Sequence, residues 1–305
     1  MEEDRLNSPS SSLITFEVLG LLLHFSQDPN SKHHGTTVWD ASMVLAKFLE
    51  RNCRKGQFCL NKLKGKRAIE LGAGCGLAGF GMALLGCNVI STDQKEVLPL
   101  LMRNVERNIL RIKQANLECS ASMGSIQVAE LDWGNSHHIA AVDPPFDYVI
   151  GTDIVYAEHL LDPLVATLNA LSGPKTTILL GYELRSTNVH EKMMNMWKTN
   201  YEVKSIPKSK MDPKYQHSSI QLFVMRLKMT LPQQVCNCGV AEIKHGDDEN
   251  IEIAEDMEDY SHGDEEGIKE RKEDLGLENK KHLNEWETRR YGSLAARLLQ
   301  NVKVT

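Results

Sequence analysis

The segment from Arg67 to Gly79, RAIELGAGCGLAG, limits the possible folds more than any other stretch of this chain. Four residues suited to a buried parallel strand, Ala68 to Leu71, lead directly into a turn with glycines at 72, 74 and 76. An apolar run suited to a helix, Leu77 to Leu85, follows. Glycine lets backbone N–H groups and the positive end of a helix approach a ligand closely, because no Cβ intervenes. The segment therefore predicts a strand, a ligand-binding turn and a helix.

Strand and helix patterns alternate from this segment to residue 228. The predicted strands are Arg67–Leu71, Asn88–Thr92, Ser125–Glu130, Asp147–Gly151, Thr176–Gly181, Tyr201–Ile206 and Ser219–Leu227. The predicted helices are Gly76–Leu85, Lys95–Ile109, Glu158–Leu171 and Val189–Trp197, with an earlier one within Thr36–Asn52. Before them, Leu13–Gln27 has the composition of a β-hairpin that turns at Gly20. Such alternation is typical of a parallel sheet with helices on both faces, whose ligands bind beyond the carboxyl ends of the strands.

Charge divides the chain into parts of different character. From residue 229 onward there are 18 acidic against 10 basic residues, whereas residues 1–228 hold 23 acidic and 25 basic ones. The near-neutral larger part argues against a large nucleic-acid-binding surface. Within 247–274 there are 14 acidic and three basic residues, a composition typical of disorder. We predict a disordered segment 1–12, a folded domain 13–228 and an acidic, largely disordered tail 229–305 that ends in a short helix or a frayed end.

Neither a secretory signal nor a membrane span is predicted. The first residues, MEEDRLNSPSSS, are acidic and polar, where a signal peptide would be basic and then apolar. The longest apolar run nearby, Val18–Leu23, is too short to cross a bilayer. Seven cysteines, scattered without a framework, favour reduced thiols. We therefore expect a monomer in the cytoplasm, with the nucleus also open.

The ligand is predicted to contain a ribose. Asp93 ends the second strand, 21 positions after Gly72, where a carboxylate can accept hydrogen bonds from both ribose hydroxyls. Gly74, Gly76 and Gly79 fit the G-x-G-x-x-G spacing of nicotinamide dinucleotide sites. However, the turn begins at Gly72, and Glu70 in front of it would repel two phosphates. An acid there suits a ligand with a cationic amino acid end, and S-adenosylmethionine has such an end and no phosphates.

Four motifs resemble those of one enzyme family. Glu70–Leu77, ELGAGCGL, resembles the first motif of seven-strand, class I S-adenosylmethionine methyltransferases. Val38–Ala41 (VWDA), Glu130–Gly134 (ELDWG) and Asp153–Tyr156 (DIVY) resemble signatures of the methyltransferase-like protein lysine methyltransferases. The resemblance covers about 13–228. It implies a Rossmann-like α/β fold with a seven-stranded, mostly parallel sheet, helices on both faces and an N-terminal β-hairpin.

Within that family, two later segments are most similar to the valosin-containing-protein lysine methyltransferase. They are Gly181–Ser186 (GYELRS) and the stretch from Ile206 through Tyr215 to Ile220. Gly181 and Leu184 depart from the pattern of that enzyme. The resemblance thus implies a chaperone-like or AAA ATPase protein as the substrate, and another chaperone or a translation factor stays open.

The resemblance also assigns roles to individual residues. The implied cofactor contacts are Trp39, Gly72, Ala73, Gly74, Asp93, Trp133 and Thr152. Asp153 and Tyr156 are the implied catalytic residues, which face the reacting amine. Elementary chemistry agrees, because a lysine amine with a pKa of about 10.4 must lose its proton before it attacks, and a desolvated channel favours the neutral form. Methyl transfer then depends mostly on positioning.

Other interpretations remain at this point. The chain could be a small-molecule N- or O-methyltransferase, or a catalytically weak binding module. Asp143–Phe146 (DPPF) matches a motif of enzymes that methylate DNA bases, but it precedes the fourth central strand instead of following it. We expect no metal site, because the pairs His33–His34 and His137–His138 are predicted to lie in solvated loops.

Overall fold

The computed structural model describes residues 6–7, 10–114 and 123–228. Its centre is a seven-stranded sheet in the order β5-β4-β3-β6-β7-β9-β8. The strands are β3 (Arg67–Leu71), β4 (Asn88–Asp93), β5 (Ile126–Glu130), β6 (Phe146–Thr152), β7 (Ser172–Glu183), β8 (Tyr201–Ser205) and β9 (Ile220–Leu227). Pairing is parallel from β5 through to β7, and β9 pairs antiparallel with both β7 and β8. The predicted Rossmann-like α/β fold is therefore confirmed.

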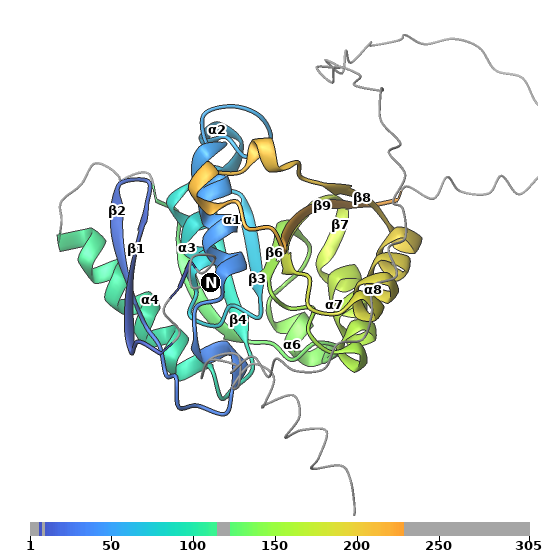
Figure 1. Ribbon diagram of the computed structural model, residues 1–305, viewed down its shortest axis with the longest axis horizontal. Coiled ribbons are helices and arrows are strands. Elements are labelled where there is room, and N and C mark those ends of the chain that lie inside the picture. Colours follow the sequence, from blue (N-terminus) through green and yellow to red (C-terminus); the bar gives the residue numbers. More distant parts are fainter. Residues whose placement is uncertain (1–5, 8–9, 115–122, 229–305) are drawn as a thin grey trace, which may run out of the picture. The chain divides into compact units, whose positions relative to one another are not determined.

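Helices cover both faces of this sheet (Figure 1). They are α1 (Asp40–Arg51), α2 (Leu60–Leu63), α3 (Leu77–Leu84), α4 (Leu98–Gln114), α6 (Ser136–Ala141), α7 (Leu161–Leu171) and α8 (Thr187–Asn200). Side chains alternate between two cores: Ala68 belongs to the core under α1, α3 and α4, and Ile69 to the core under α7 and α8. This alternation is the period of two that a strand buried on both faces imposes.

The predicted N-terminal hairpin is present and packs on α4 (Figure 1). It consists of β1 (Leu13–Val18) and β2 (Leu21–Ser26), paired antiparallel. Two buried asparagines of α4 bind the outer edge of β2. Asn108 bonds both the N–H and the C=O of His24, and Asn104 does the same for Ser26, at 2.8–3.1 Å. The amides thus take the place of a neighbouring strand, and they fix the start of the loop that leads to α1.

Four short 3₁₀ turns complete the described elements. They are η1 (His34–Thr36), η2 (Glu158–Leu160), η3 (Lys208–Lys210) and η4 (Pro213–Tyr215). Helix α4 begins three residues later than predicted and ends five later, because Ile112 extends its buried face. Helix α6 was not predicted, since none of its six residues is buried and it has no apolar face to read.

The structure describes part of the N-terminal segment predicted to be disordered, but none of the predicted C-terminal tail. The described residues of the segment predicted to be disordered, 1–12, make tertiary contacts: Asn7 donates to Gln27 at 3.1 Å, and Gln27 donates to the carbonyl of Ser11 at 2.8 Å. The predicted acidic tail, 229–305, lies outside the described residues.

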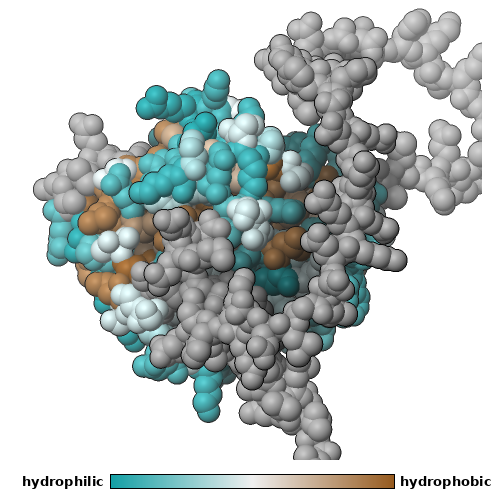
Figure 2. Space-filling model, in the orientation of Figure 1, coloured by the Kyte–Doolittle hydropathy of each residue, from teal (hydrophilic) through white to brown (hydrophobic). Residues whose placement is uncertain are grey.

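The surface of the described residues carries both hydrophobic and hydrophilic side chains. In the view of Figure 2, hydrophobic residues show between hydrophilic ones on the side where the hairpin lies. Leu13 and Leu22, two of the exposed apolar residues, belong to that hairpin, whose outward side also carries Thr15 and Glu17. Over the described ranges, no helix combines the length and apolar character that a bilayer crossing needs.

Candidate functional site

One cavity of about 560 Å³ opens at the carboxyl ends of the central parallel strands. Its walls come from the turn after β3, the ends of β4 and β6, the loop after β5 and the loop before α1. The structure brings together all nine residues that the sequence analysis assigned to the site: Trp39, Gly72, Ala73, Gly74, Asp93, Trp133, Thr152, Asp153 and Tyr156. This is the position that the topology of a parallel sheet predicts for a ligand.

The glycine turn is shaped by backbone that has no room for side chains. Gly72 and Gly74 both have a φ of 58°, in the left-handed region. A Cβ on Gly72 would lie 2.8 Å from the side chain of Ile154, and one on Gly74 would lie 3.0 Å from the carbonyl oxygen of Gly35. Gly76, also at positive φ, is the N-cap residue of α3. The turn therefore needs glycine for both its conformation and its packing.

The Asp93 carboxylate is fixed by two backbone hydrogen bonds and borders the cavity. Its Oδ2 accepts the N–H of Gly74 at 2.7 Å, and its Oδ1 accepts the N–H of Gln94 at 2.8 Å. Burial raises the pKa of this carboxyl, and the two backbone hydrogen bonds oppose that effect. Each oxygen retains a further lone pair. The carboxylate can thus accept hydrogen bonds from a vicinal diol, as the sequence predicts for a ribose.

Glu70 does not face the ligand, which corrects the argument that its charge suits a cationic end. The side chain is buried and lies outside the cavity wall. Its oxygens accept the N–H of Gly79 at 2.9 Å and the hydroxyl of Ser91 at 2.7 Å. Burial raises the pKa of Glu70 to about 7. Glu70 therefore ties α3 to β4 below the glycine turn, and its sequence position alone was a misleading guide to contact.

The loop before α1 forms a wall of the cavity, which the prediction of a solvated loop missed. His34 lies with its ring centroid 5.8 Å from that of Tyr156, and its carbonyl oxygen accepts the indole N–H of Trp39 at 2.9 Å. His33, although exposed, also borders the cavity. No local sequence pattern predicts this wall, because it depends on the close approach of Gly35 to Gly74, two residues that lie far apart in the sequence.

Asp153 directly follows β6 and is a non-glycine residue in the left-handed region, with a φ of 55°. It is only 8% exposed. Its Oδ1 accepts two hydrogen bonds, from the backbone N–H of Glu183 at 3.2 Å and from Nη2 of Arg185 at 2.9 Å. Both donors lie at or just after the end of β7, so these bonds fix the carboxylate beside that strand.

Arg185 is a site residue that the sequence analysis did not single out. The same Nη2 that binds Asp153 also donates to Glu183 Oε2 at 2.9 Å. The guanidinium carbon lies 4.8 Å from the centre of the Trp39 ring, within the range of a cation–π contact. Asp40 lies nearby, and burial together with the charges of Glu183 and Asp153 raises its pKa to about 6. Two carboxylates thus bind the guanidinium, and the carboxyl of Asp40 lies close to both of them.

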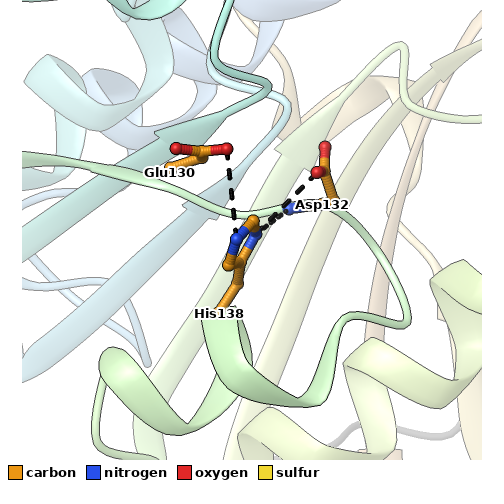
Figure 3. A group of neighbouring side chains, drawn as sticks. All are labelled: Glu130, Asp132 and His138. Carbon is orange, nitrogen blue, oxygen red and sulfur yellow. Dashed lines mark hydrogen bonds and ion pairs between the residues drawn. The ribbon is translucent and has the colours of Figure 1, made fainter.

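Figure 3 shows a second cluster, Glu130 at the end of β5, Asp132 in the loop that follows and His138 in α6. One ligand atom of each lies within 4.8 Å of the others, a spacing that would admit a metal ion. However, Nδ1 of His138 accepts the backbone N–H of Asp132 at 3.1 Å. Its other nitrogen, Nε2, lies 4.0 Å from Glu130 Oε1. His138 is therefore a support of this loop, and its predicted place in a solvated loop is wrong.

The DNA-methylation motif is far from this chemistry. Asp143–Phe146 lies at the amino end of β6, and none of its residues borders the cavity. Arg67 packs there instead, with its guanidinium 4.6 Å from the centre of the Phe146 ring. The motif is a structural loop, so the interpretation as an enzyme that flips out a DNA base loses its only support.

The donor half of the cavity fits S-adenosylmethionine. Glycine turn, carboxylate and indole are the elements that its amino acid end, ribose and adenine require. The described lining near the turn presents backbone N–H groups and Asp93, with no lysine or arginine arranged to hold a pyrophosphate; Arg185 is engaged by Asp153 and Glu183. The nicotinamide alternative is thereby disfavoured.

Comparison with known proteins agrees with this geometry. A sequence model described as lysine methyltransferase matches residues 20–200. Protein N-lysine methyltransferase METTL21A of Danio rerio is 37% identical over 180 residues, 59% of this chain and 75% of that protein. The Mus musculus METTL21A is 34% identical, over 57% of this chain and 72% of that one. EEF1A lysine methyltransferase 3 of Xenopus tropicalis is 34% identical, over 51% and 63%. The chain therefore belongs to the lysine methyltransferase family, whose members use S-adenosylmethionine.

Proposed function

We propose that this protein methylates a lysine side chain of another protein at the acceptor end of the cavity, with Asp153 and Tyr156 holding the amine. The observation that carries the proposal is the shared cavity. Asp153 and Tyr156 border the same space as the glycine turn and Asp93, so a donor and an amine would meet there. Family membership supplies the reaction class, and the residue roles are inferred from this geometry.

In the donor half, we assign binding to backbone and to four side chains. The turn of Gly72, Ala73 and Gly74 would receive the amino acid end, and Asp93 the ribose hydroxyls. Trp39 and Trp133 would flank the ligand with their rings, and Thr152 would contact it from the end of β6. When bound, S-adenosylmethionine supplies a methyl group on a cationic sulfur, which is a strong electrophile.

In the acceptor half, the residues prepare the amine. The Asp153 carboxylate can accept an N–H bond from the lysine, which orients the nitrogen lone pair, and the Tyr156 ring can bind the ammonium form before it reacts. The neutral lysine nitrogen forms the new N–C bond while the carbon–sulfur bond breaks, and the bonding pair stays on sulfur. The methylated nitrogen then releases a proton. Most of the rate enhancement would come from orientation.

The substrate is proposed more coarsely than the reaction. Sequence motifs favour a chaperone-like or AAA ATPase protein, whereas one similar protein is named for EEF1A, a different kind of substrate. We therefore propose a protein as substrate, met in the cytoplasm or the nucleus, and leave its class to be decided by experiment among these candidates.

The test is incubation of the full chain with methyl-labelled S-adenosylmethionine and three protein samples. These are recombinant valosin-containing protein, recombinant EEF1A and total cell extract, followed by mass spectrometry of any labelled protein. A labelled lysine supports the proposal and identifies the substrate. Label in small metabolites supports the small-molecule alternative. Donor binding by calorimetry without any transfer supports the binding module, and either of these two outcomes contradicts the proposal.

A further inference from the structure

We propose that Arg185 is a positioning residue of the acceptor site: its guanidinium fixes Asp153 and Glu183 and supplies the positive charge that offsets them beside the incoming lysine. The inference rests on the proposed function of the cavity. It adds a residue to which neither the motifs nor the family description assigns a role.

The hydrogen bonds of Arg185 join the two strands that end at the acceptor site. Its Nη2 donates to Asp153 at the end of β6 and to Glu183 at the end of β7, both at 2.9 Å. The Arg185 side chain is 20% exposed, and that of Asp153 only 3%. Charge-assisted bonds at such positions are strong and geometrically specific. The orientation of the Asp153 carboxylate therefore depends on Arg185.

The other face of the guanidinium links the acceptor end to the donor end. It lies over the Trp39 ring, with 4.8 Å between the guanidinium carbon and the ring centre. Its Nε is buried and has no hydrogen-bond partner among the described residues. A purely structural ion pair would gain by satisfying that donor, because a buried unpaired donor costs stability. The unpaired Nε instead favours the interpretation that the Arg185 charge serves the acceptor site and not only the stability of the fold.

The charge balance explains why a fixed cation is useful here. The charged and titratable groups at the acceptor end form two sets. His34, Asp153, Tyr156, His159 and Arg185 border the cavity, and Asp40, Tyr182, Glu183 and His217 do not border it but interact electrostatically with one another or with Asp153 and Arg185. Carboxylates outnumber fixed cations three to one in this set. Negative surroundings stabilise the ammonium form of lysine and so oppose deprotonation. Arg185 reduces that effect.

It follows that loss of the Arg185 charge should raise the pKa of the bound lysine amine. The neutral amine is the reacting form, so the rate at neutral pH should fall and recover at higher pH. A residue that only stabilised the fold would lower the rate without moving its pH dependence. The direction of the pH shift therefore distinguishes the two roles.

The experiment measures kcat between pH 6.5 and 10 with the protein that the wild-type enzyme labels. Arg185→Gln is expected to lower kcat about tenfold at pH 7.5 and to shift the apparent pKa of the profile upward by about one unit. Arg185→Lys keeps the charge, so its shift should be smaller. Lys192→Gln, which removes an exposed cation paired with Glu158, is the matched control and should shift nothing.

Glu183→Gln provides a test of opposite sign that does not depend on the folding of the arginine variants. It removes one negative charge, so the apparent pKa should move downward. Melting temperatures and donor affinity by calorimetry accompany each profile. A deficit of Arg185→Gln that is constant across the pH range, or an unchanged profile for both residues, overturns the inference while the lysine activity stands. Failure of the wild-type enzyme to label any lysine overturns the proposed function, and this inference with it.

Discussion

The two halves of the cavity are built from different materials. In the donor half the ligand-binding turn is built from main chain: the left-handed glycines 72 and 74, a backbone N–H that binds Asp93, and the carbonyl of Gly35 packed against Gly74. The acceptor half is made of charged side chains, with Asp153 and Glu183 joined by Arg185. The glycine turn should therefore be sensitive to substitutions that add atoms, whereas the charged cluster should be most sensitive to substitutions that remove a charge.

This difference shows how one cavity can bind a methyl donor of fixed structure in one half and an acceptor that differs between enzymes in the other. Backbone contacts recognise a ligand of fixed shape, and they do not change when surface residues vary. Side chains at strand ends can be exchanged without altering the sheet. The expected consequence is that donor binding and methyl transfer respond to different substitutions, and the following predictions test that separation in order of expected effect.

Asp153→Asn should have the largest effect. It removes the charge but keeps the left-handed backbone accessible, because Asn tolerates positive φ. We expect transfer to a protein lysine to fall on the order of 100-fold, with donor affinity by calorimetry changed less than about threefold. Asp162→Asn, in the first turn of α7, is the matched carboxylate control. Equal losses of donor affinity and transfer would show that the two halves are not separable.

Gly74→Ala should act on the other half. The added methyl group would lie 3.0 Å from the Gly35 carbonyl, and alanine is strained at a φ of 58°. We expect donor affinity to fall on the order of tenfold and stability to fall by about 1 kcal/mol. Gly65→Ala carries a similar φ of 74° with open space around its Cβ, so it should lose stability and keep donor affinity. Normal donor binding by Gly74→Ala would contradict the steric account.

The same contrast explains what the sequence could reveal. Glycine spacing and Asp93 were readable because they follow a strand at fixed intervals, and the bounds predicted for β3 agree with the structure. The pairing of Arg185 with Asp153 spans 32 positions and depends on β6 lying beside β7, so no local pattern encodes it. Glu70 shows the reverse error, because its position beside the turn suggested contact while its side chain points into the core.

Glu70 also predicts a pH dependence of stability under the donor half. Its pKa of about 7 in the folded protein is above its ordinary value of 4.5, so the folded state favours the protonated form. The corresponding stability is present below pH 4.5 and is lost as the pH rises through 7. Between pH 6 and 8 this amounts to roughly 1.4 kcal/mol. Urea unfolding at both pH values should show this loss, and Glu70→Gln should lack it. Equal slopes for both proteins would refute the assignment.

The smallest effect is expected for substitution of His138. This substitution tests whether the cluster of Glu130, Asp132 and His138 supports the loop or binds a metal ion. His138→Leu removes the acceptor of the Asp132 N–H, which should lower stability by about 1 kcal/mol and weaken donor binding about twofold through the Trp133 loop. His138→Asn can place its amide oxygen near the position of Nδ1 and should restore both properties, and His137→Leu, an exposed neighbour, should change neither. Because Nδ1 is already engaged, EDTA should leave the rate of lysine methylation unchanged. Loss of activity in EDTA that zinc reverses, and that His138→Leu abolishes, would instead make this cluster a metal site.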